Sequence, residues 1–309
     1  MAEYLNQKIL ERIEEKKKLL DKSRPLPKSA LERLKEQIII EWTYNSNAIE
    51  GNGLTLKETK LVLEQGITVA GKSLREHFEA TNHRDAILFL EKLIKNKKIK
   101  ESDVLKIHGI ISKNIEKEYA GKYRRGMVRI LGAKKLPPNY LKIPKLMDEL
   151  YQWINKNPEK LNIIELASLA HYKFVAIHPH YDGNGRTARL LMNLILMQNS
   201  YRPVVILKND RRRYYNALHK ADEGDYKPFV LLMAISIERS LDLYLRAVKE
   251  KKEETLELLS KLSKKTVYSQ EYLGLLARQG KLAAVKEGKK WYSSLRAIQE
   301  YKNKRDRKR

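Results

Sequence analysis

HPHYDGNGRTARLLMN, residues 178 to 193, brings histidines, a carboxylate, glycines and arginines together in front of an apolar helical pattern. Gly183 and Gly185 flank an asparagine, and glycines let backbone N–H groups approach phosphate oxygens without a Cβ clash. A helix that starts directly after them points the positive end of its dipole at the same oxygens. Arg186 and Arg189 lie three residues apart, near one another on the first turn, and both can bind phosphate. The pattern therefore predicts a polyphosphate site at the start of this helix.

Two further side chains of this stretch suit a reaction of a metal-bound nucleotide. Asp182 supplies a hard oxygen ligand for Mg²⁺, and His178 can accept a proton near neutral pH. DGNG alone is typical of a tight turn. A calcium loop is excluded, because placing Asp182 at its third position puts His180 first and Leu191 twelfth, where acidic ligands are needed. A zinc site built on the histidines leaves the two arginines without a role.

The composition is that of an ordinary folded protein. With 309 residues, 42% of them hydrophobic and 33% charged, the chain can bury one large core and carry a small appendage. Cysteine is absent, which excludes disulfides, thiolate nucleophiles and cysteine-based zinc sites. We find no signal-peptide core and no membrane-spanning run, so we expect a cytoplasmic protein without a membrane partner. The net charge of +25 predicts attraction to polyanions.

Apolar residues recur at three- and four-residue spacing through most of the chain, which predicts a mainly α fold. Thr55 and Glu58 form a capping-box pattern before one of the expected helices. The segment KYRRGMVRILGAKKLPPNYL, residues 122–141, differs: β-branched residues near two glycines and a proline pair predict a short hairpin. The expected helices cover residues 5–22, 28–42, 56–65, 77–97, 101–117, 143–156, 163–177, 186–198, 210–222 and 226–250.

The C-terminal end of the chain has a composition of its own. Residues 261–309 hold fifteen basic and four acidic side chains. We expect a helical connector over residues 251–265. In residues 266–309, a helix over Tyr268 to Ala277, a turn and a wing over Lys286 to Trp291 predict a winged helix-turn-helix module, similar to excisionase-type modules. Such a module binds DNA or docks on a protein, and both remain open.

The stretch HPHYDGNGRTAR closely resembles the signature of Fic-domain AMP transferases: His, Pro, Phe, any residue, Asp or Glu, Gly-Asn-Gly-Arg, and Arg three residues later. His180 departs from it, standing where the family has a phenylalanine that packs inward. We expect His180 either to find a hydrogen-bond partner or to leave the loop less rigid. The resemblance covers roughly residues 25 to 250 and implies a Fic-type helical bundle with a β-hairpin flap. The implied domains are an N-terminal helical region with an inhibitory helix at 1–55, a Fic catalytic domain at 56–250, the connector at 251–265 and the winged module at 266–309.

The resemblance implies a protein adenylyltransferase, which moves AMP from ATP to Ser, Thr or Tyr hydroxyls of proteins, itself included, with Mg²⁺ or Mn²⁺. It makes His178 the general base and Asp182 the metal ligand. On spacing alone, the tyrosines at 214 and 215 are typical of helix core, whereas the resemblance places them at the adenine pocket. The implied ATP site comprises Gly183, Asn184, Gly185, Arg186, Arg189, Tyr214 and Tyr215, and the implied flap contains Leu131 and Gly132.

A second motif lies far upstream. Residues 46–51, Ser-Asn-Ala-Ile-Glu-Gly, resemble the inhibitory motif of the same family: Ser or Thr, three residues, Glu, then Gly or Asn. The resemblance implies that Glu50 pairs with Arg189 and occupies the space that the γ-phosphate of ATP needs, within a motif that begins at Ser46. A carboxylate suits this role because it offers a guanidinium the same edge as a phosphate. The stretch also suits a helix end with Gly51 in the left-handed conformation, and the two interpretations are compatible.

Three alternatives stay open at this point. Members of the family also remove AMP from proteins, and the Glu50 motif is compatible with that direction. A hypothesis of a different class is a DNA-binding regulator that uses residues 266–309 to bind DNA and the Fic domain as a nucleotide sensor. A homodimer is open as well, and inhibition in this family can depend on it.

Overall fold

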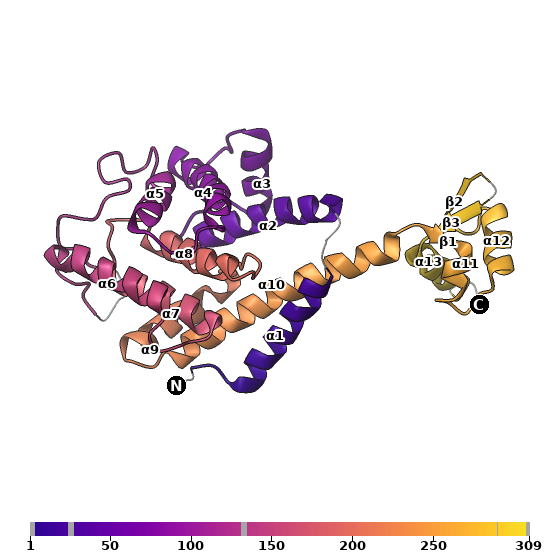
Figure 1. Ribbon diagram of the computed structural model, residues 1–309. Helices are drawn as coiled ribbons and strands as arrows, with labels where there is room; N and C mark the ends of the chain where they lie inside the picture. Colours follow the sequence, from indigo (N-terminus) through magenta and orange to yellow (C-terminus); the bar gives the residue numbers. More distant parts are fainter. Residues whose placement is uncertain (1–3, 24–27, 131–134, 289, 307–309) are drawn as a thin grey trace. The chain divides into compact units, whose positions relative to one another are not determined.

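The computed structural model describes residues 4–23, 28–130, 135–288 and 290–306 (Figure 1). The chain divides into two compact units, one of residues 1–18 and 35–242 and the other of residues 19–34 and 243–309. No helix in the described ranges is long and apolar enough to cross a membrane. The elements are α1 (Gln7–Lys22), α2 (Lys28–Ile49), α3 (Leu56–Gln65), α4 (Leu74–Leu93), α5 (Glu101–Ile111), η1 (Tyr140–Lys142), α6 (Ile143–Lys156), α7 (Ile163–Ile177), α8 (Asn184–Gln198), η2 (Lys208–Asp210), α9 (Arg211–Asp222), α10 (Lys227–Glu254), β1 (Glu257–Leu258), α11 (Leu259–Ser263), α12 (Gln270–Arg278), β2 (Ala284–Glu287), β3 (Lys290–Ser293) and α13 (Leu295–Asp306).

Capping side chains set the start of several helices in the first unit. The predicted box at α3 is confirmed: the Thr55 side chain accepts a hydrogen bond from the Glu58 N–H, and the Glu58 carboxylate accepts one from the Thr55 N–H. Ser73 and Glu76 form the same reciprocal pair at α4, where the sequence analysis did not predict a cap. The predicted bounds of α3, α6 and α7 agree with the structure to the residue.

Helix α8 lies at the centre of the first unit. It packs against α7, and α4 and α5 also contact it (Figure 1). Every residue from Arg186 to Met197 is buried, so α8 has no solvent face, as expected of a helix inside a core. The glycine-rich stretch at its N-terminus is therefore held by packing on several sides.

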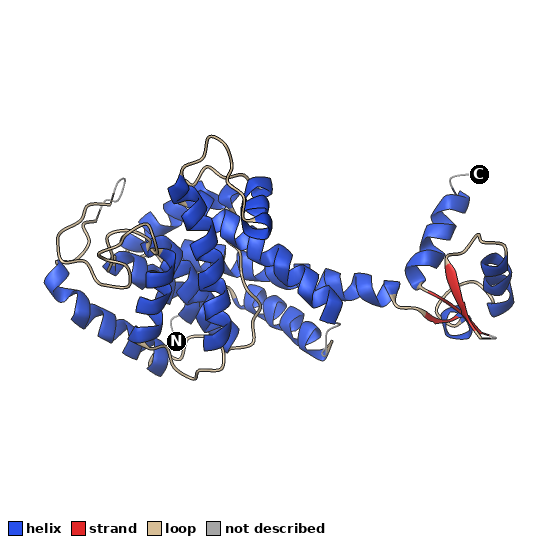
Figure 2. Ribbon diagram, turned by 90° about the horizontal axis from the view of Figure 1, so that it is seen from above, coloured by secondary structure: helices blue, strands red, loops and turns tan. Residues whose placement is uncertain are grey.

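All strands of the described residues lie in the second unit (Figure 2). They form one antiparallel sheet in the order β1-β3-β2, and β2 and β3 pair as a hairpin with Glu287 opposite Lys290. Helix α12 and this hairpin occur where the sequence predicts a helix and a wing. The core of the unit comprises Leu259, Leu262, Leu273, Leu276, Ala277, Leu282 and Ile298.

The predicted hairpin over residues 122–141 is wrong for the part that the structure describes. Residues 122–130 and 135–139 contain no strand, and a 3₁₀ turn begins at Tyr140. The Arg124 N–H donates to the Pro179 carbonyl oxygen in the loop between α7 and α8, and not to a partner within the segment. Leu131 and Gly132 lie outside the described residues.

The single helix expected over the connector, residues 251–265, is also wrong. Helix α10 ends at Glu254, and β1 and α11 follow within the same stretch. The cause is burial: Leu259 and Leu262 of α11 pack in the core of the second unit, and β1 pairs with β3. Apolar residues at helical spacing thus belong to a strand and a short helix that complete a small domain.

Candidate active site

The loop between α7 and α8 starts with an unusual backbone at His178. This residue ends α7 with φ 51° and ψ 59°, and its N–H donates to the Phe174 carbonyl oxygen. The left-handed region costs a residue with a Cβ roughly 1–2 kcal/mol. Such strain persists where surrounding contacts fix it, and it turns the imidazole away from the axis of α7 toward a cavity.

The side chain of Asn184, the first residue of α8, holds this loop together. Its amide oxygen accepts from the His180 N–H at 3.0 Å, and its amide nitrogen donates to the His180 carbonyl oxygen at 2.8 Å. Gly183 precedes it at φ 75°, and the Thr187 hydroxyl donates to the Gly183 carbonyl oxygen. Asn184 is thus a loop-fixing residue in this structure, with its side chain fully committed to His180.

His180 finds the hydrogen-bond partner that its burial requires. Its Nδ1 donates to the Lys122 carbonyl oxygen at 2.8 Å, and its ring stacks on His108 with centroids 3.5 Å apart and planes 6° from parallel. The Gly121 N–H donates to His108 Nδ1, so in the neutral ring His108 Nε2 carries the proton and donates to the Asp182 carbonyl oxygen at 3.1 Å. Burial lowers the pKa of both imidazoles, that of His108 to about 4. The pair is therefore neutral at pH 7 and fastens the loop.

His178 lines the cavity with its imidazole largely buried. Burial lowers its pKa to about 4, and the charge of Arg124 acts in the same direction, while Glu50 and Asp182 oppose it. At neutral pH the ring is therefore unprotonated and able to take a proton.

Asp182 is surrounded by positive groups. Its Oδ1 accepts from the Gly183 N–H at 2.5 Å and from Arg186 Nη2 at 3.2 Å, and its Oδ2 pairs with Arg75 of α4. Burial alone would raise the pKa of this carboxyl, but Arg186, the Gly183 N–H and Arg75 outweigh it and lower the pKa. Glu79 of α4 lies 3.1 Å from Arg186 Nη1. The sequence analysis did not predict Arg75 and Glu79 as part of this cluster, because no motif contains them.

Asp182 fits a magnesium ion that is shared with phosphates. The described residues contain no group of three or more acidic or histidine side chains that could hold a metal by themselves. Mg²⁺ in nucleotide sites needs only one or two carboxylates, because phosphates and waters supply the other ligands. The Asp182 side chain is ionised and 37% exposed, so it can serve as that carboxylate.

Glu50 and Arg189 meet at the start of α8, as the family resemblance implies. Arg189 Nη2 donates to Glu50 Oε1 at 2.7 Å and to the Ser46 carbonyl oxygen at 2.8 Å, and Nε donates to Ser46 Oγ at 3.0 Å. Burial alone would lower the pKa of Arg189, but Glu50 raises it. A Cβ added to Gly185 would lie 2.2 Å from Glu50 Oε1, so the carboxylate rests directly on this glycine. Glu50 therefore covers the backbone that the sequence assigns to phosphate.

The helix end at Glu50 also has the predicted glycine cap. Gly51 has φ 100°, its N–H donates to the Ala48 carbonyl oxygen, and the Asn52 N–H donates to the Asn47 carbonyl oxygen. This is the paired hydrogen-bond pattern of a Schellman motif. The predicted cap is confirmed, and it fixes the direction from which the Glu50 side chain leaves α2.

The two tyrosines of α9 differ in their surroundings. Tyr214 is 1% exposed, bonds through its hydroxyl to His171 Nε2 at 2.9 Å, and lies with its ring 5.9 Å from the Arg189 guanidinium. Tyr215 is half-buried, with the Arg211 guanidinium 5.0 Å from its ring centroid. Both line the cavity, but only Tyr215 has a partly exposed ring; Tyr214 mainly supports Arg189 from the core.

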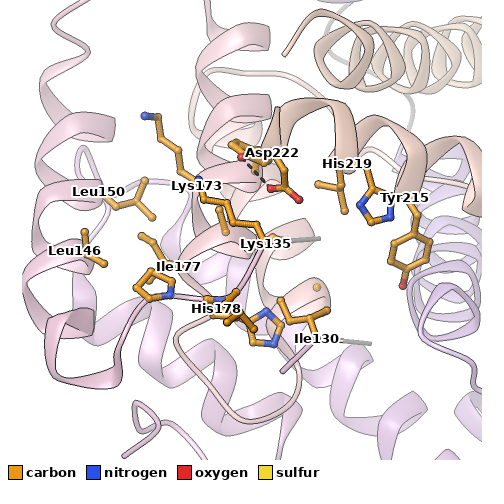
Figure 3. A pocket seen from close by; sticks show the side chains of 18 of the residues that line it. Ile130, Lys135, Leu146, Leu150, Lys173, Ile177, His178, Tyr215, His219 and Asp222 are labelled. Carbon is orange, nitrogen blue, oxygen red and sulfur yellow. Dashed lines mark hydrogen bonds between the residues drawn. The ribbon is translucent and has the colours of Figure 1, made fainter. Parts of the chain in front are cut away.

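A cavity of about 1100 Å³ is lined by both tyrosines and by His178. Figure 3 shows side chains of α6 and α7 on one side of it and side chains of α9 on the other, with His178 and Ile130 between them. Glu50 and Gly185 line it as well, so the imidazole and the start of α8 open into the same space. The described residues of the predicted flap on its rim are Ile130, Lys135, Leu136, Pro137 and Pro138.

Comparison with known proteins agrees with this geometry. The profile of the Fic/DOC family matches residues 98–196. The chain is 39% identical to the protein adenylyltransferase Fic of Aedes aegypti over 253 residues, 81% of this chain and 50% of that protein. A Fic domain containing signalling protein from Bacteroides thetaiotaomicron has a similar structure, with a TM-score of 0.73 and 30% identity over 77% of this chain and 97% of that one. Fic-1 from C. elegans follows with a TM-score of 0.71 and 34% identity over 79% and 73%. The chain spans about half the length of the curated relatives it matches.

Proposed function

Because this chain belongs to the Fic family, we propose that it transfers AMP from ATP to hydroxyl groups of proteins, with His178 as the general base. One observation carries the proposal. The left-handed end of α7 and the glycine-rich start of α8 bring an unprotonated imidazole and the backbone of Gly185 to the same cavity. Positioning and charge stabilisation at such a site supply most of the rate of a phosphoryl or nucleotidyl transfer.

In this proposal the phosphates of ATP lie at the N-terminus of α8. The N–H groups of Asn184 and Gly185 and the positive end of the helix dipole attract the oxygens, while the Gly183 N–H stays bonded to Asp182. Arg186 and Arg189 contribute charge, and Tyr215 with the apolar wall of the cavity receives the adenine.

Asp182 would hold Mg²⁺, or Mn²⁺, together with phosphate oxygens. Such an ion supplies charge neutralisation on the phosphates. The chain prepares this carboxylate by keeping it ionised: Arg186 and the Gly183 N–H lower its pKa. Displacement of Arg75 from Oδ2 frees the oxygen on the exposed side.

The chemical step exchanges one phosphorus–oxygen bond for another. His178 takes the proton of a Ser, Thr or Tyr hydroxyl, the oxygen bonds to the α-phosphorus, and the bond to the β-phosphate oxygen breaks. AMP ends as an ester on the protein, and pyrophosphate leaves with the electron pair of the broken bond. The positive start of α8 and the two arginines stabilise the charge that develops on the leaving group.

Glu50 holds the resting site in an inhibited state in this proposal. Its carboxylate sits on Gly185 and pairs with Arg189, the same groups that the terminal phosphate would contact. A protein whose Glu50 orients water would instead release AMP from a modified target, and that direction is the second outcome of the test below.

Intact-mass analysis of the full chain with ATP and Mg²⁺ tests the function. Glu50→Gly should gain mass equal to one or more AMP groups, and Glu50→Gly with His178→Ala should not. A control, His219→Ala, changes a histidine of the same cavity wall that has no role in the proposal, and it should keep the activity. If Glu50→Gly gains no mass while it binds ATP, and wild type removes AMP from the modified chain, the proposed direction is wrong.

A second candidate function, DNA binding, is favoured by the second unit. Its β2–β3 hairpin follows α12, and Lys281, Lys286 and Lys290 are all exposed on this hairpin and the turn before it. We propose that this face binds duplex DNA as a winged helix-turn-helix module does. Lys286→Glu with Lys290→Glu in the full chain should weaken binding, and wild-type affinity should fall steeply with salt. Salt-insensitive binding to DNA, or no binding, would favour docking on a protein. A homodimer is also left open by the sequence, and light scattering tests it.

A further inference from the structure

Arg124 is a buried arginine in the segment that leads into the predicted flap. Its side chain is 2% exposed. Nε donates to the His178 carbonyl oxygen at 2.9 Å, Nη1 to the Gly126 carbonyl oxygen at 2.7 Å, and Nη2 to the Pro138 carbonyl oxygen at 2.6 Å. One guanidinium therefore joins three backbone positions that are distant from each other in the sequence.

The partners of this guanidinium are all neutral. Burial lowers the pKa of Arg124, which marks the cost of removing its charge from water. Among the residues the structure describes, Arg75, Arg186 and Arg189 each pair with a carboxylate. The guanidinium of Arg124 instead donates to backbone carbonyl oxygens. What the buried guanidinium contributes in return for this cost is a rigid, planar set of N–H donors that can bind several carbonyl oxygens at once.

The backbone around Arg124 adds to the same connection. The Arg124 N–H donates to the Pro179 carbonyl oxygen, and the Arg125 N–H donates to the Tyr181 hydroxyl at 3.2 Å. A Cβ on Gly126 would lie 3.0 Å from that hydroxyl, so the chain passes closely over Tyr181. The catalytic loop and the start of the flap segment are thus joined by side chains and backbone alike.

We infer that Arg124 is a positioning residue, which fixes the carbonyl group of His178 and fastens both ends of the flap segment to the catalytic loop. The peptide plane of His178 sets the direction of its imidazole, and the strained left-handed conformation is held by the bond from Nε. Gly126 and Pro138 bound the segment on the rim of the cavity, and the same guanidinium fixes both. The inference rests on the proposed function, because the positioned imidazole is the proposed base.

The neighbouring Arg125 provides a matched control. It has the same side chain and differs by one position in the sequence, but it is exposed. Arg124→Lys keeps a positive charge near the His178 carbonyl with fewer donors, and Arg124→Gln keeps donors without the charge. The charged groups that influence the His178 imidazole are Arg124, which lowers its pKa, and Glu50 and Asp182, which raise it.

The first measurement follows the titration of His178 by NMR of histidine-labelled full-length chain, with the signal assigned through His178→Ala. This readout does not depend on activity. Arg124→Gln should raise the midpoint above the wild-type value of about 4, and Arg124→Lys should leave it near that value. Arg125→Gln leaves the hydrogen bond to the His178 carbonyl oxygen in place and should keep the wild-type midpoint. An unchanged midpoint in Arg124→Gln would overturn the inference, whatever the enzyme does.

The second measurement uses the same changes in the Glu50→Gly background. Arg124→Gln should lower kcat roughly 100-fold, as a misplaced reacting group does. Binding of a non-hydrolysable ATP analogue should change less than about threefold, because Arg124 contacts no group assigned to phosphate, and Arg125→Gln should behave as its parent. Arg124→Lys should recover part of kcat. If Glu50→Gly transfers no AMP, the proposed function fails, while the titration still decides the role of Arg124. If Glu50→Gly transfers AMP and the added Arg124→Gln change leaves kcat the same, the inference alone fails.

Discussion

Removing the Glu50 carboxylate should activate the site, and the structure gives the size of the effect. Glu50→Gly deletes the carboxylate that lies 2.7 Å from Arg189 Nη2 and rests on Gly185. Arg189 keeps its two bonds to Ser46, so its guanidinium stays in place. Glycine also suits the end of α2, because Glu50 is the last residue before the left-handed Gly51. The change therefore opens the phosphate site with little disturbance of the helix.

The gain follows from the contact that ATP no longer has to displace. Arg189 is 2% exposed and Glu50 is 30% exposed, so water screens this pair only in part. A hydrogen bond to a charged group contributes roughly 1.5–3 kcal/mol. Because each 1.4 kcal/mol is a factor of ten, the rate at low ATP should rise roughly 10-fold to 150-fold. Glu50→Gln keeps the shape and a neutral hydrogen bond, so its gain should lie between wild type and Glu50→Gly.

The assay is the initial rate of AMP incorporation at ATP concentrations well below saturation, read by intact mass. A thermal melt with and without an ATP analogue accompanies it. Glu50→Gly leaves a buried guanidinium without its carboxylate, so it should melt lower than wild type and be stabilised more by the analogue, whose phosphates restore a counter-charge. The reasoning is refuted if Glu50→Gly transfers AMP within about threefold of the wild-type rate while His178→Ala transfers none.

Three other predictions test the loop, the metal ligand and a cap. His180→Phe should make the free energy of unfolding fall less steeply as pH drops from about 6.5 to 4. A buried imidazole of lowered pKa gains its proton only on unfolding, so acid in this range favours the unfolded state. For His108, whose pKa is about 4, the loss of stability across this range is roughly 3 kcal/mol. Denaturant titrations at several pH values measure the slope, and an equal slope in both proteins would contradict this assignment. Asp182→Asn should weaken Mn²⁺ binding in the presence of an ATP analogue at least roughly tenfold by electron paramagnetic resonance, and Arg75→Ala should strengthen it, because Arg75 competes for the carboxylate. Thr55→Ala should cost about 1 kcal/mol of stability by chemical denaturation, with no change in nucleotide binding.

The fold was predictable where local signals set an element by themselves. Capping at Thr55 and apolar spacing fixed α3, α6 and α7 to the residue. Helix α2 runs to Ile49, beyond the expected end at 42. The prediction stopped early because the last turns of this helix bury the polar side chains of residues 45–47. Polar residues that face a core remove the amphipathic pattern, so periodicity alone could not follow the helix there.

The hairpin and the connector failed for a different reason. Both segments have local patterns that agree with the expectation, but tertiary contacts satisfy their backbone or apolar groups in another way. The Arg124 N–H bonds to the catalytic loop, the Arg124 side chain bonds to the Gly126 and Pro138 carbonyl oxygens, and the core of the second unit takes Leu259 and Leu262. Contacts between distant parts of the chain outweigh propensity in both places.

The site divides along the same line. The local stretch at 178–189 indicated which histidine, carboxylate, glycines and arginines lie together, and the family resemblance implied the contact between Glu50 and Arg189 that the structure has. Partners contributed singly by other helices were missed, among them Arg75 and Glu79 of α4 and His108 of α5. His180 was the one hint of His108 in the sequence, since a buried imidazole in place of a phenylalanine indicates unusual neighbours, and His108 stacks on its ring. Nothing in the pair of adjacent arginines tells Arg124 from Arg125.

In the proposed mechanism, the charges around Arg189 let one carboxylate control the site without a change of fold. Arg189 is buried among Ser46 groups, and Glu50 supplies the counter-charge that its burial requires. A phosphate that arrives at the start of α8 replaces one anion by another at the same guanidinium, so the cost of an unpaired buried charge never arises during the exchange. The two states then differ by the small difference between two anion contacts. Inhibition of this kind is a competition that ATP concentration, or any contact that draws Glu50 away from Gly185, can reverse.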